Sequence, residues 1–280
     1  MTVLRQGFIT QDLPHLSVDE LAALADRAGA PSLELYVGGL GGVIDPSAPD
    51  AGNLRAIERL REHGCEVAAL ATYRLVSGVE PRTAQDAIDV LEATIRLASL
   101  AGVPVVSTLS GFPVDEDRDR TITEILPRAL GPAVELAGAG GVRLAFENWF
   151  ETNLRDRSHW HLFFETFPDA HVGLVFDPSH LVWQRIDWEQ ALVDYGQRVF
   201  LAHAKDVAYD DERLVLVGVL GNGWWRYVVP GLGVLSFERY VALLRDVGFD
   251  GVLSIEPEDR EVSPEEGVVA AAAYLSRFVS

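Results

Sequence analysis

The sequence predicts an α/β protein folded as a single (β/α)8 TIM barrel, and three observations support this fold class. Short apolar runs rich in β-branched residues alternate with amphipathic helical stretches along all 280 residues. Most of these runs lack polar alternation, which is typical of strands covered on both faces. No low-complexity tract or long linker divides the chain, so we expect residues 1–280 to form one domain, as barrels of about 250 residues do.

Eight apolar runs predict the strands of the barrel. Each is short and is bounded by loops that contain Gly, Pro, Asn or Asp, which is the pattern of strands that alternate with helices. The runs begin near Val3, Ser32, Cys65, Val103, Val142, Val172, Val199 and Gly251.

Amphipathic helical stretches fall between these runs. Ser17-Val-Asp-Glu20 has the spacing of a capping box and precedes apolar residues at helical intervals. Segment 53–63 is followed by Gly64, a common helix stop. Segment 83–101 is the longest predicted helix. Further helices are expected at 121–139, 188–195, 237–247 and 264–278.

A doubly wound open sheet is the alternative architecture. It is disfavoured because no apolar run leads into the G-x-G-x-x-G pattern and the chain has no P-loop. The glycine-rich segment 38–42 runs into Val-Ile-Asp-Pro instead of a helical stretch, so we interpret it as a loop.

Composition excludes several classes of protein. The chain has 23 basic and 42 acidic residues, a net charge of −19, which is too acidic for a nucleic-acid-binding surface. The single cysteine, Cys65, excludes a disulfide within the chain and suits a reducing compartment. We see no signal-peptide pattern and no apolar run long enough to span a membrane, so a cytoplasmic protein with no membrane partner is expected.

Charged or imidazole side chains end four consecutive apolar runs. These residues are Glu147, Asp177, His203 and Glu256. The carboxyl ends of barrel strands carry the active site, so the four side chains are expected to lie together. Three carboxylates and one imidazole suit one divalent metal ion such as Mn, Mg, Co or Zn, with two coordination positions left for adjacent substrate oxygens.

The sequence around these positions resembles the xylose isomerase-like TIM-barrel superfamily. The matching stretches are FENW at 146–149, FDPSH at 176–180, HAKD at 203–206 and the long segment 230–259. They cover the second half of the chain, whereas the first half resembles the family only in its strand–helix rhythm. The family includes sugar isomerases and epimerases, inosose dehydratase and AP endonuclease family 2. The resemblance implies the same four metal ligands: Glu147, Asp177, His203 and Glu256.

The resemblance also implies a chemistry. A metal-dependent isomerase or epimerase of this family acts on a ketose, keto-polyol or sugar phosphate by removing the proton α to a carbonyl, through a metal-stabilised enediolate. Glu147 and Glu256 would be the acid–base pair. The alternative is a lyase or dehydratase acting on a keto-inositol or 3-keto-glycoside with the same site. Barrels of this kind often pair, which leaves a homodimer open.

Two further functions are disfavoured. The endonuclease branch binds three zinc ions with additional histidines, but here the third and fourth runs end near Thr72 and Thr108 without histidine. The acidic charge also argues against a DNA substrate. A sugar-binding barrel without turnover is disfavoured because all four ligand positions are filled.

Residues beside the ligands are candidates for substrate binding. By resemblance, His180 contacts a substrate oxygen, and the alternative is packing in its loop. Lys205, the only lysine of the chain, lies two residues after His203 and so faces the same side of the strand. We expect it to bind substrate, the alternative being an ion pair with Asp206 or another acid. Asp206 is expected to orient His203.

More distant residues complete the predicted site. Trp149, Trp224 and Trp225 are candidates for an apolar wall against a sugar ring, and segment 207–233 is long enough to fold over the site as a lid. Arg226 would meet a phosphate or carboxylate, or else form a surface ion pair. Glu34 would reach a substrate hydroxyl, or else pair with Arg5 or Arg74.

Overall fold

The chain closes into a parallel eight-stranded barrel, which confirms the predicted fold class. The computed structural model describes residues 4–38, 42–47 and 50–279. The strands are β1 (Arg5–Ile9), β2 (Ser32–Tyr36), β3 (Glu66–Ala71), β4 (Val105–Thr108), β5 (Arg143–Glu147), β6 (Val172–Phe176), β7 (Val199–Ala204) and β10 (Val252–Ile255). Their order around the barrel is β1-β10-β7-β6-β5-β4-β3-β2. Pairing of Arg5 with Val252 closes the ring and rules out the open doubly wound sheet.

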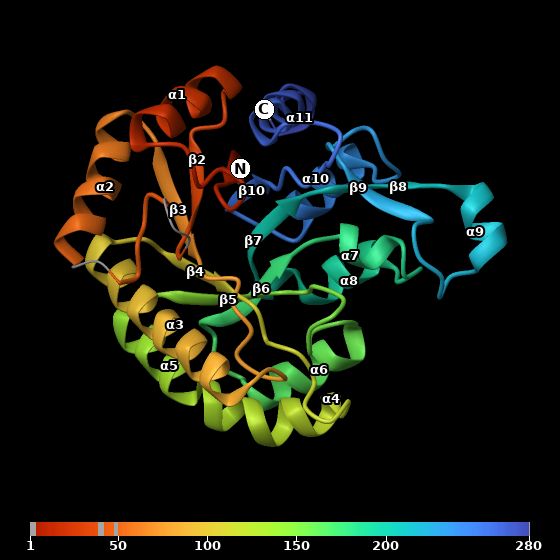
Figure 1. Cartoon of the computed structure of the whole chain (residues 1–280), viewed down its shortest axis with the longest axis horizontal. Coiled ribbons are helices and arrows are strands. Elements are labelled where there is room, and N and C mark those ends of the chain that lie inside the picture. The colour runs from red at the N-terminus through yellow and green to blue at the C-terminus, as the bar shows by residue number, and fades with distance from the viewer. Residues whose placement is uncertain (1–3, 39–41, 48–49, 280) are drawn as a thin grey trace.

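Helices surround the barrel (Figure 1). They are α1 (Val18–Ala28), α2 (Asp50–Glu62), α3 (Pro81–Ala101), α4 (Arg118–Arg120), α5 (Leu126–Gly140), α6 (Arg157–Thr166), α7 (Ser179–Val182), α8 (Trp188–Tyr195), α9 (Asp211–Val217), α10 (Phe237–Asp246) and α11 (Pro264–Val279). A π-helical turn, η1 (Thr121–Ile125), precedes α5, and a 3-10 turn, η2 (Gly196–Arg198), follows α8. Within the described ranges, no helix combines the length and apolarity needed to cross a membrane.

Local signals placed most helices within a few residues. The Ser17–Glu20 capping box is formed, with Ser17 N donating to Glu20 Oε2 at 2.8 Å. Helix α3 begins earlier than predicted because Glu80 caps it by accepting the amides of Arg82 and Thr83. The predicted helix at 121–139 is divided into η1 and α5. The sequence did not predict α6 or α9, and most of the glycine-rich segment 38–42 lies outside the described residues.

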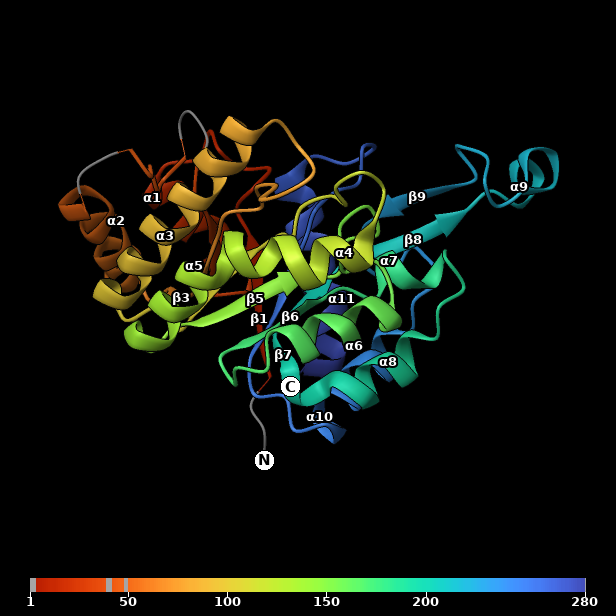
Figure 2. The same cartoon turned by 90° about the horizontal axis from the view of Figure 1, so that it is seen from below.

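Segment 206–228 forms a projecting arm, which corrects the expectation of a lid. Strands β8 (Asp206–Tyr209) and β9 (Trp225–Val228) pair antiparallel, and α9 lies between them in sequence. Both views show α9 directed away from the barrel (Figures 1 and 2). Only the β9 side of the arm lines the cavity at the barrel mouth, through Trp225 and Tyr227.

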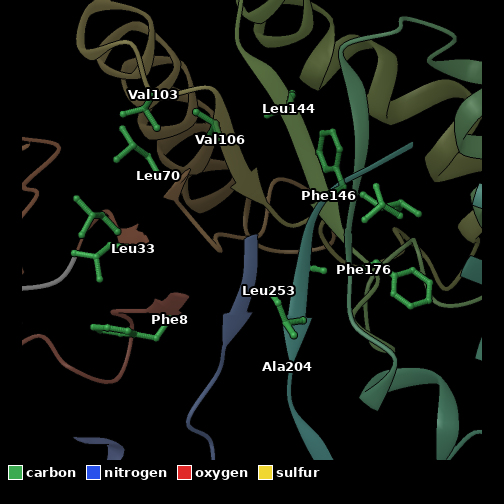
Figure 3. Close-up of a cluster of buried hydrophobic side chains, with 14 of the residues drawn as sticks. Phe8, Leu33, Leu70, Val103, Val106, Leu144, Phe146, Phe176, Ala204 and Leu253 are labelled. Carbon is green, nitrogen blue, oxygen red and sulfur yellow. The ribbon is translucent and has the colours of Figure 1, made fainter. Parts of the chain in front are cut away.

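The apolar core lies mainly between the barrel and its helices. Figure 3 shows part of this layer, in which Phe8, Leu33 and Leu253 come from neighbouring strands. Alternate residues of each strand point the other way, into the barrel. A smaller apolar cluster that includes Ala145 and Val175 occupies these inward positions. Continuing the same alternation to the strand ends turns the polar residues of β5, β6, β7 and β10 inward.

Candidate metal centre

Four side chains converge at the carboxyl ends of the barrel strands. Glu147 ends β5, Asp177 and Glu256 directly follow β6 and β10, and His203 lies near the end of β7. All four are buried, and one potential ligand atom of each lies within 4.8 Å of the others. His203 Nδ1 lies 3.4 Å from Glu147 Oε1 and 3.2 Å from Glu256 Oε2. The residues predicted from the strand ends therefore meet at one point.

The unsatisfied atoms of this cluster fit a divalent cation. Asp177 Oδ2, His203 Nδ1 and Glu256 Oε2 are buried and make no hydrogen bond of suitable geometry with any described residue. Buried polar atoms normally have a hydrogen-bond partner, whereas these three have only charged neighbours, among them Lys205 and one another. Such a group of ligand atoms is a suitable place for an ion. Three oxygens and one nitrogen form a donor set that divalent metals accept.

Charge at the cluster also favours a bound cation. Burial opposes the charged form of His203, but Glu34, Glu147 and Glu256 raise its pKa well above its usual value. Burial likewise opposes ionisation of Glu147, yet hydrogen bonds from His180 and His203 hold its pKa well below its usual value. The shift of His203 shows that the surrounding carboxylates stabilise positive charge, and the shift of Glu147 shows that this glutamate is held as an anion.

Glu34 lies behind His203, which corrects the prediction that it reaches substrate. Its carboxylate is fully buried and accepts hydrogen bonds from Ser107 Oγ at 2.6 Å and Ser254 Oγ at 2.8 Å. It also lies 3.1 Å from His203 Nε2. The alternative partners are engaged elsewhere, because Arg5 pairs with Glu66 and Arg74 with the Gly38 carbonyl. Glu34 therefore holds the imidazole with Nδ1 towards the metal cluster.

Asp206 does not orient His203, because its carboxylate is used by the backbone. It accepts the amide hydrogens of Val207, Gly231, Gly233 and Leu235 at 2.8–3.0 Å. A side chain at position 233 would collide with this carboxylate, since an added Cβ would lie 2.3 Å from Asp206 Oδ1. Asp206 thus fixes the loop that follows the arm. The role predicted for Asp206, orienting His203, belongs to Glu34.

Lys205 points into the cluster. Its side chain is 2% exposed, and Nζ lies 2.6 Å from Glu256 Oε2, 3.2 Å from Asp177 Oδ2 and 3.3 Å from Glu258 Oε2. Burial opposes its charge, but these carboxylates raise its pKa well above the usual value. The structure thus contains the alternative considered for Lys205, an ion pair with an acid, although the acid is not Asp206. Lys205 pairs with the acids of the site and also lines the cavity above it.

His180 lies on α7 and faces the same cavity. Its Nε2 is 3.3 Å from Glu147 Oε1 and 3.3 Å from Lys205 Nζ. Its Nδ1 lies 2.9 Å from the Tyr227 hydroxyl. The His180 imidazole therefore contacts both a candidate metal ligand, Glu147, and the cavity wall formed by β9.

A cavity of about 360 Å³ opens above the four potential ligands. Its size lies at the lower end of small-molecule sites. The lining residues are Gln11, Tyr73, Leu109, Glu147, Trp149, Phe150, His180, Lys205, Trp225, Tyr227, Glu256 and Glu258.

The four outer candidates that remain have different outcomes. Trp149 and Trp225 line the cavity, but Trp224 does not: its ring is buried beside Trp183 and Tyr209, and Nε1 donates to the Val219 carbonyl. Arg226 forms the alternative ion pairs, with Asp259 at 3.0 Å and Glu261 at 2.8 Å.

Sequence reasoning missed several residues of the cavity. Tyr73 donates to Glu34 Oε1 at 2.8 Å and lies 3.1 Å from His203 Nε2. Tyr227 and Glu258 were also overlooked. The signal available for Glu258 was its spacing, two residues after Glu256, and Tyr227 stands at the same spacing from Trp225.

The fold and the site define a class of protein, and a family model identifies it. The model described as "Xylose isomerase-like TIM barrel" matches residues 22–278. The chain belongs to this family, which confirms the resemblance seen at the strand ends.

Two curated proteins illustrate which sequences are similar to this chain. Uncharacterized protein YfiH of Bacillus subtilis (strain 168) is 25% identical over 99% of this chain and 100% of its own length. Inosose dehydratase of Clostridium perfringens (strain ATCC 13124) is 27% identical over 59% of this chain and 56% of its own length.

Solved structures share the fold. A xylose isomerase domain protein from Planctomyces limnophilus has a TM-score of 0.76 at 18% identity and covers 99% of this chain and 97% of its own. The IOLI protein, solved with a zinc atom, has a TM-score of 0.71 at 18% identity, with 99% of each chain covered. L-ribulose 3-epimerase has a TM-score of 0.73 at 19% identity and covers 99% of this chain and 95% of its own. At these identities the likeness concerns the fold alone.

Proposed function

We propose that the chain is a divalent-metal-dependent sugar isomerase or epimerase that moves a proton at the carbon next to a ketone. One observation carries the proposal: two glutamates, Glu147 and Glu256, flank His203 Nδ1 at 3.4 and 3.2 Å and both line the cavity. Fold relatives that include L-ribulose 3-epimerase support this class of reaction.

The residues of the site have distinct tasks in this reaction. Glu147, Asp177, His203 and Glu256 would hold the ion. When bound, a divalent metal polarises a carbonyl group and stabilises negative charge next to it. A carboxylate oxygen of one glutamate takes the proton from one face of the carbon, and the other glutamate returns a proton from the opposite face. Return of the proton to the neighbouring carbonyl carbon gives isomerisation instead, when a second proton passes from the hydroxyl of the first carbon to the former ketone oxygen.

Other cavity residues orient the substrate and exclude water. Lys205 Nζ and His180 Nε2 lie 3.3 Å apart and both border the cavity, where they can donate hydrogen bonds to one substrate oxygen. Trp149, Phe150 and Trp225 form an aromatic side of the same cavity. Such a wall limits water and raises the strength of the polar contacts.

A dehydratase is the second candidate. The inosose dehydratase of Clostridium perfringens is a relative by sequence, and the same proton removal leads to loss of water when a hydroxyl stands β to the ketone. His180 borders the cavity next to Glu147 and can donate a proton to that leaving hydroxyl.

Solvent exchange tests the proposal. Protein loaded with Mn²⁺ is incubated in D₂O with a panel of ketoses and keto-inositols, and deuterium at the α carbon is measured by NMR. We expect exchange with at least one neutral ketone, and we expect Glu147→Gln and Glu256→Gln each to slow it by about 10²–10⁴-fold.

The control is Glu135→Gln, which changes an exposed glutamate on α5. This variant should incorporate deuterium into the ketone at the same rate as the unmodified chain. Absence of exchange across the panel by metal-loaded protein would contradict the proposal. Release of water without deuterium in recovered substrate would assign the dehydratase reaction instead.

A further inference from the structure

The cavity above the metal cluster continues outwards. Two neighbouring hollows of about 520 and 460 Å³ adjoin the inner one of about 360 Å³. All three share Tyr227 and Glu258 as lining residues, so together they form one cleft. The outer part runs between the segment after β10 and the β9 side of the arm. The whole cleft is larger than a single sugar ring needs.

An edge of fixed aromatic side chains lies where the inner cavity meets the two outer hollows, which we call the outer cleft. Trp225 borders both, and its ring stacks on Trp183 with centroids 4.6 Å apart and an interplanar angle of 14°. Tyr227 is held by His180 Nδ1 at 2.9 Å, and the Lys205 ammonium lies 4.7 Å from the centre of its ring. Fixed aromatic rings provide contact area with little loss of side-chain entropy.

Arg260 offers the outer cleft an uncommitted donor group. It is exposed, lines both outer hollows, and makes no hydrogen bond or ion pair with any residue in the described part of the chain. Its neighbour Arg226 is held by two carboxylates, and Lys205 is enclosed by three. Arg260 is therefore free to donate to a ligand.

The acids around Arg260 select against an anion. Asp12, Glu258 and Asp259 line one outer hollow with it, and Glu258, Glu261 and Arg226 line the other, so the two hollows together hold four acids and two arginines. A phosphate or carboxylate placed there would face more negative than positive groups. Hydroxyl groups suit the same surroundings, because they donate to carboxylates and accept from a guanidinium.

We propose that the outer cleft is a subsite for a second, uncharged sugar unit, so that the substrate is a keto-glycoside of at least two units. The ketone-bearing ring occupies the inner cavity, and the second ring lies against Trp225 and Tyr227 within reach of Arg260. This inference rests on the proposed function for the identity of the inner ring.

Binding of unoxidised sugars tests the subsite without requiring turnover. Isothermal titration of Mn²⁺-loaded full-length protein compares methyl glucoside with cellobiose, maltose and sucrose. We expect at least one disaccharide to bind at least tenfold more tightly than methyl glucoside. Arg260→Ala should reduce that ratio to below threefold. Arg128→Ala, an exposed arginine on α5, is the matched control and should keep the full ratio.

Several outcomes would overturn the subsite. They are equal affinity for methyl glucoside and all three disaccharides, no detectable binding of any of them, or an unchanged ratio in Arg260→Ala. Tighter binding of glucose 6-phosphate than of every disaccharide would also overturn it, as an anion site. A disaccharide preference in a protein that shows no deuterium exchange would refute the proposed function and leave the subsite standing.

Discussion

At the scale of single residues, the two nitrogens of His203 have separate environments. Nδ1 faces Glu147 and Glu256, whereas Nε2 faces Glu34 and the Tyr73 hydroxyl. A metal ligand needs one nitrogen free of hydrogen, and the carboxylate on the other side of the ring determines which one that is. We therefore propose that Glu34 is a positioning residue, which would act on a bound metal through His203.

Replacing Glu34 tests this role. Glu34→Gln keeps the shape of the side chain but removes the charge that faces Nε2, so we expect metal affinity to fall about 10–100-fold. Titration of the metal-free protein with Mn²⁺ measures it, with Glu135→Gln as the control. A Mn²⁺ affinity equal to that of the unmodified chain would show that Glu34 contributes to packing inside the barrel and not to metal binding.

Lys205 is the second residue with a testable role. Lys205→Arg keeps the positive charge, but the planar guanidinium cannot match the compact contacts of Nζ with Asp177 and Glu256. We expect kcat/KM for the exchanging ketone to fall at least about tenfold, the scale seen for groups that hold metal ligands in place. Arg128→Lys is the surface control. An unchanged kcat/KM would show that Lys205 has no special role in substrate binding.

At the scale of elements, the arm depends on one carboxylate. Asp206 begins β8 and binds four backbone amides, three of them in the loop 231–235 that leads into α10. This places the loop and β9 against the barrel mouth. The cavity wall formed by Trp225 and Tyr227 thus rests on a residue that does not line the cavity itself.

Asp206→Ala should therefore affect both stability and substrate binding. Removing the acceptor leaves the buried amides of Val207 and Leu235 unpaired, and we expect the free energy of unfolding to fall by about 2–4 kcal/mol. The KM for ketone should rise as β9 loosens. Urea denaturation and steady-state kinetics measure the two effects, and Asp206→Asn, which keeps one oxygen acceptor, should be intermediate. A urea midpoint unchanged by Asp206→Ala would contradict this account.

At the scale of the whole molecule, the barrel holds three carboxylates and an imidazole in its interior mouth. Folding brings these charges together, and a cation that binds only the folded chain offsets their repulsion. Its effect on stability is set by the ratio of free metal to the dissociation constant.

Metal removal should therefore lower the melting temperature. At 100 times the dissociation constant, a bound ion adds about 2.7 kcal/mol. For a chain of this size that corresponds to a difference of about 5–10 °C. Scanning calorimetry with Mn²⁺ and with EDTA measures it. Asp177→Asn should reduce the difference, and superimposable curves for the unmodified chain with and without metal would contradict the presence of an ion site.

The sequence by itself determined the barrel and the composition of the candidate metal centre. Alternating strands and helices predict parallel strands, and parallel strands place their carboxyl ends at one mouth. The four candidate ligands lie at or next to the carboxyl ends of their strands, so their meeting required no knowledge of the contacts between distant strands.

The tertiary structure alone decided what surrounds these four residues. Glu34 on β2 reaches His203 on β7 across the barrel interior, past β1 and β10, and no local pattern encodes that distance. The arm likewise exposes Trp225 to the cavity and buries the adjacent Trp224 against Trp183 and Tyr209. The physical reason is the same in both cases: neighbouring residues of a strand point in opposite directions, and only closure of the barrel and pairing of the arm determine what each direction meets.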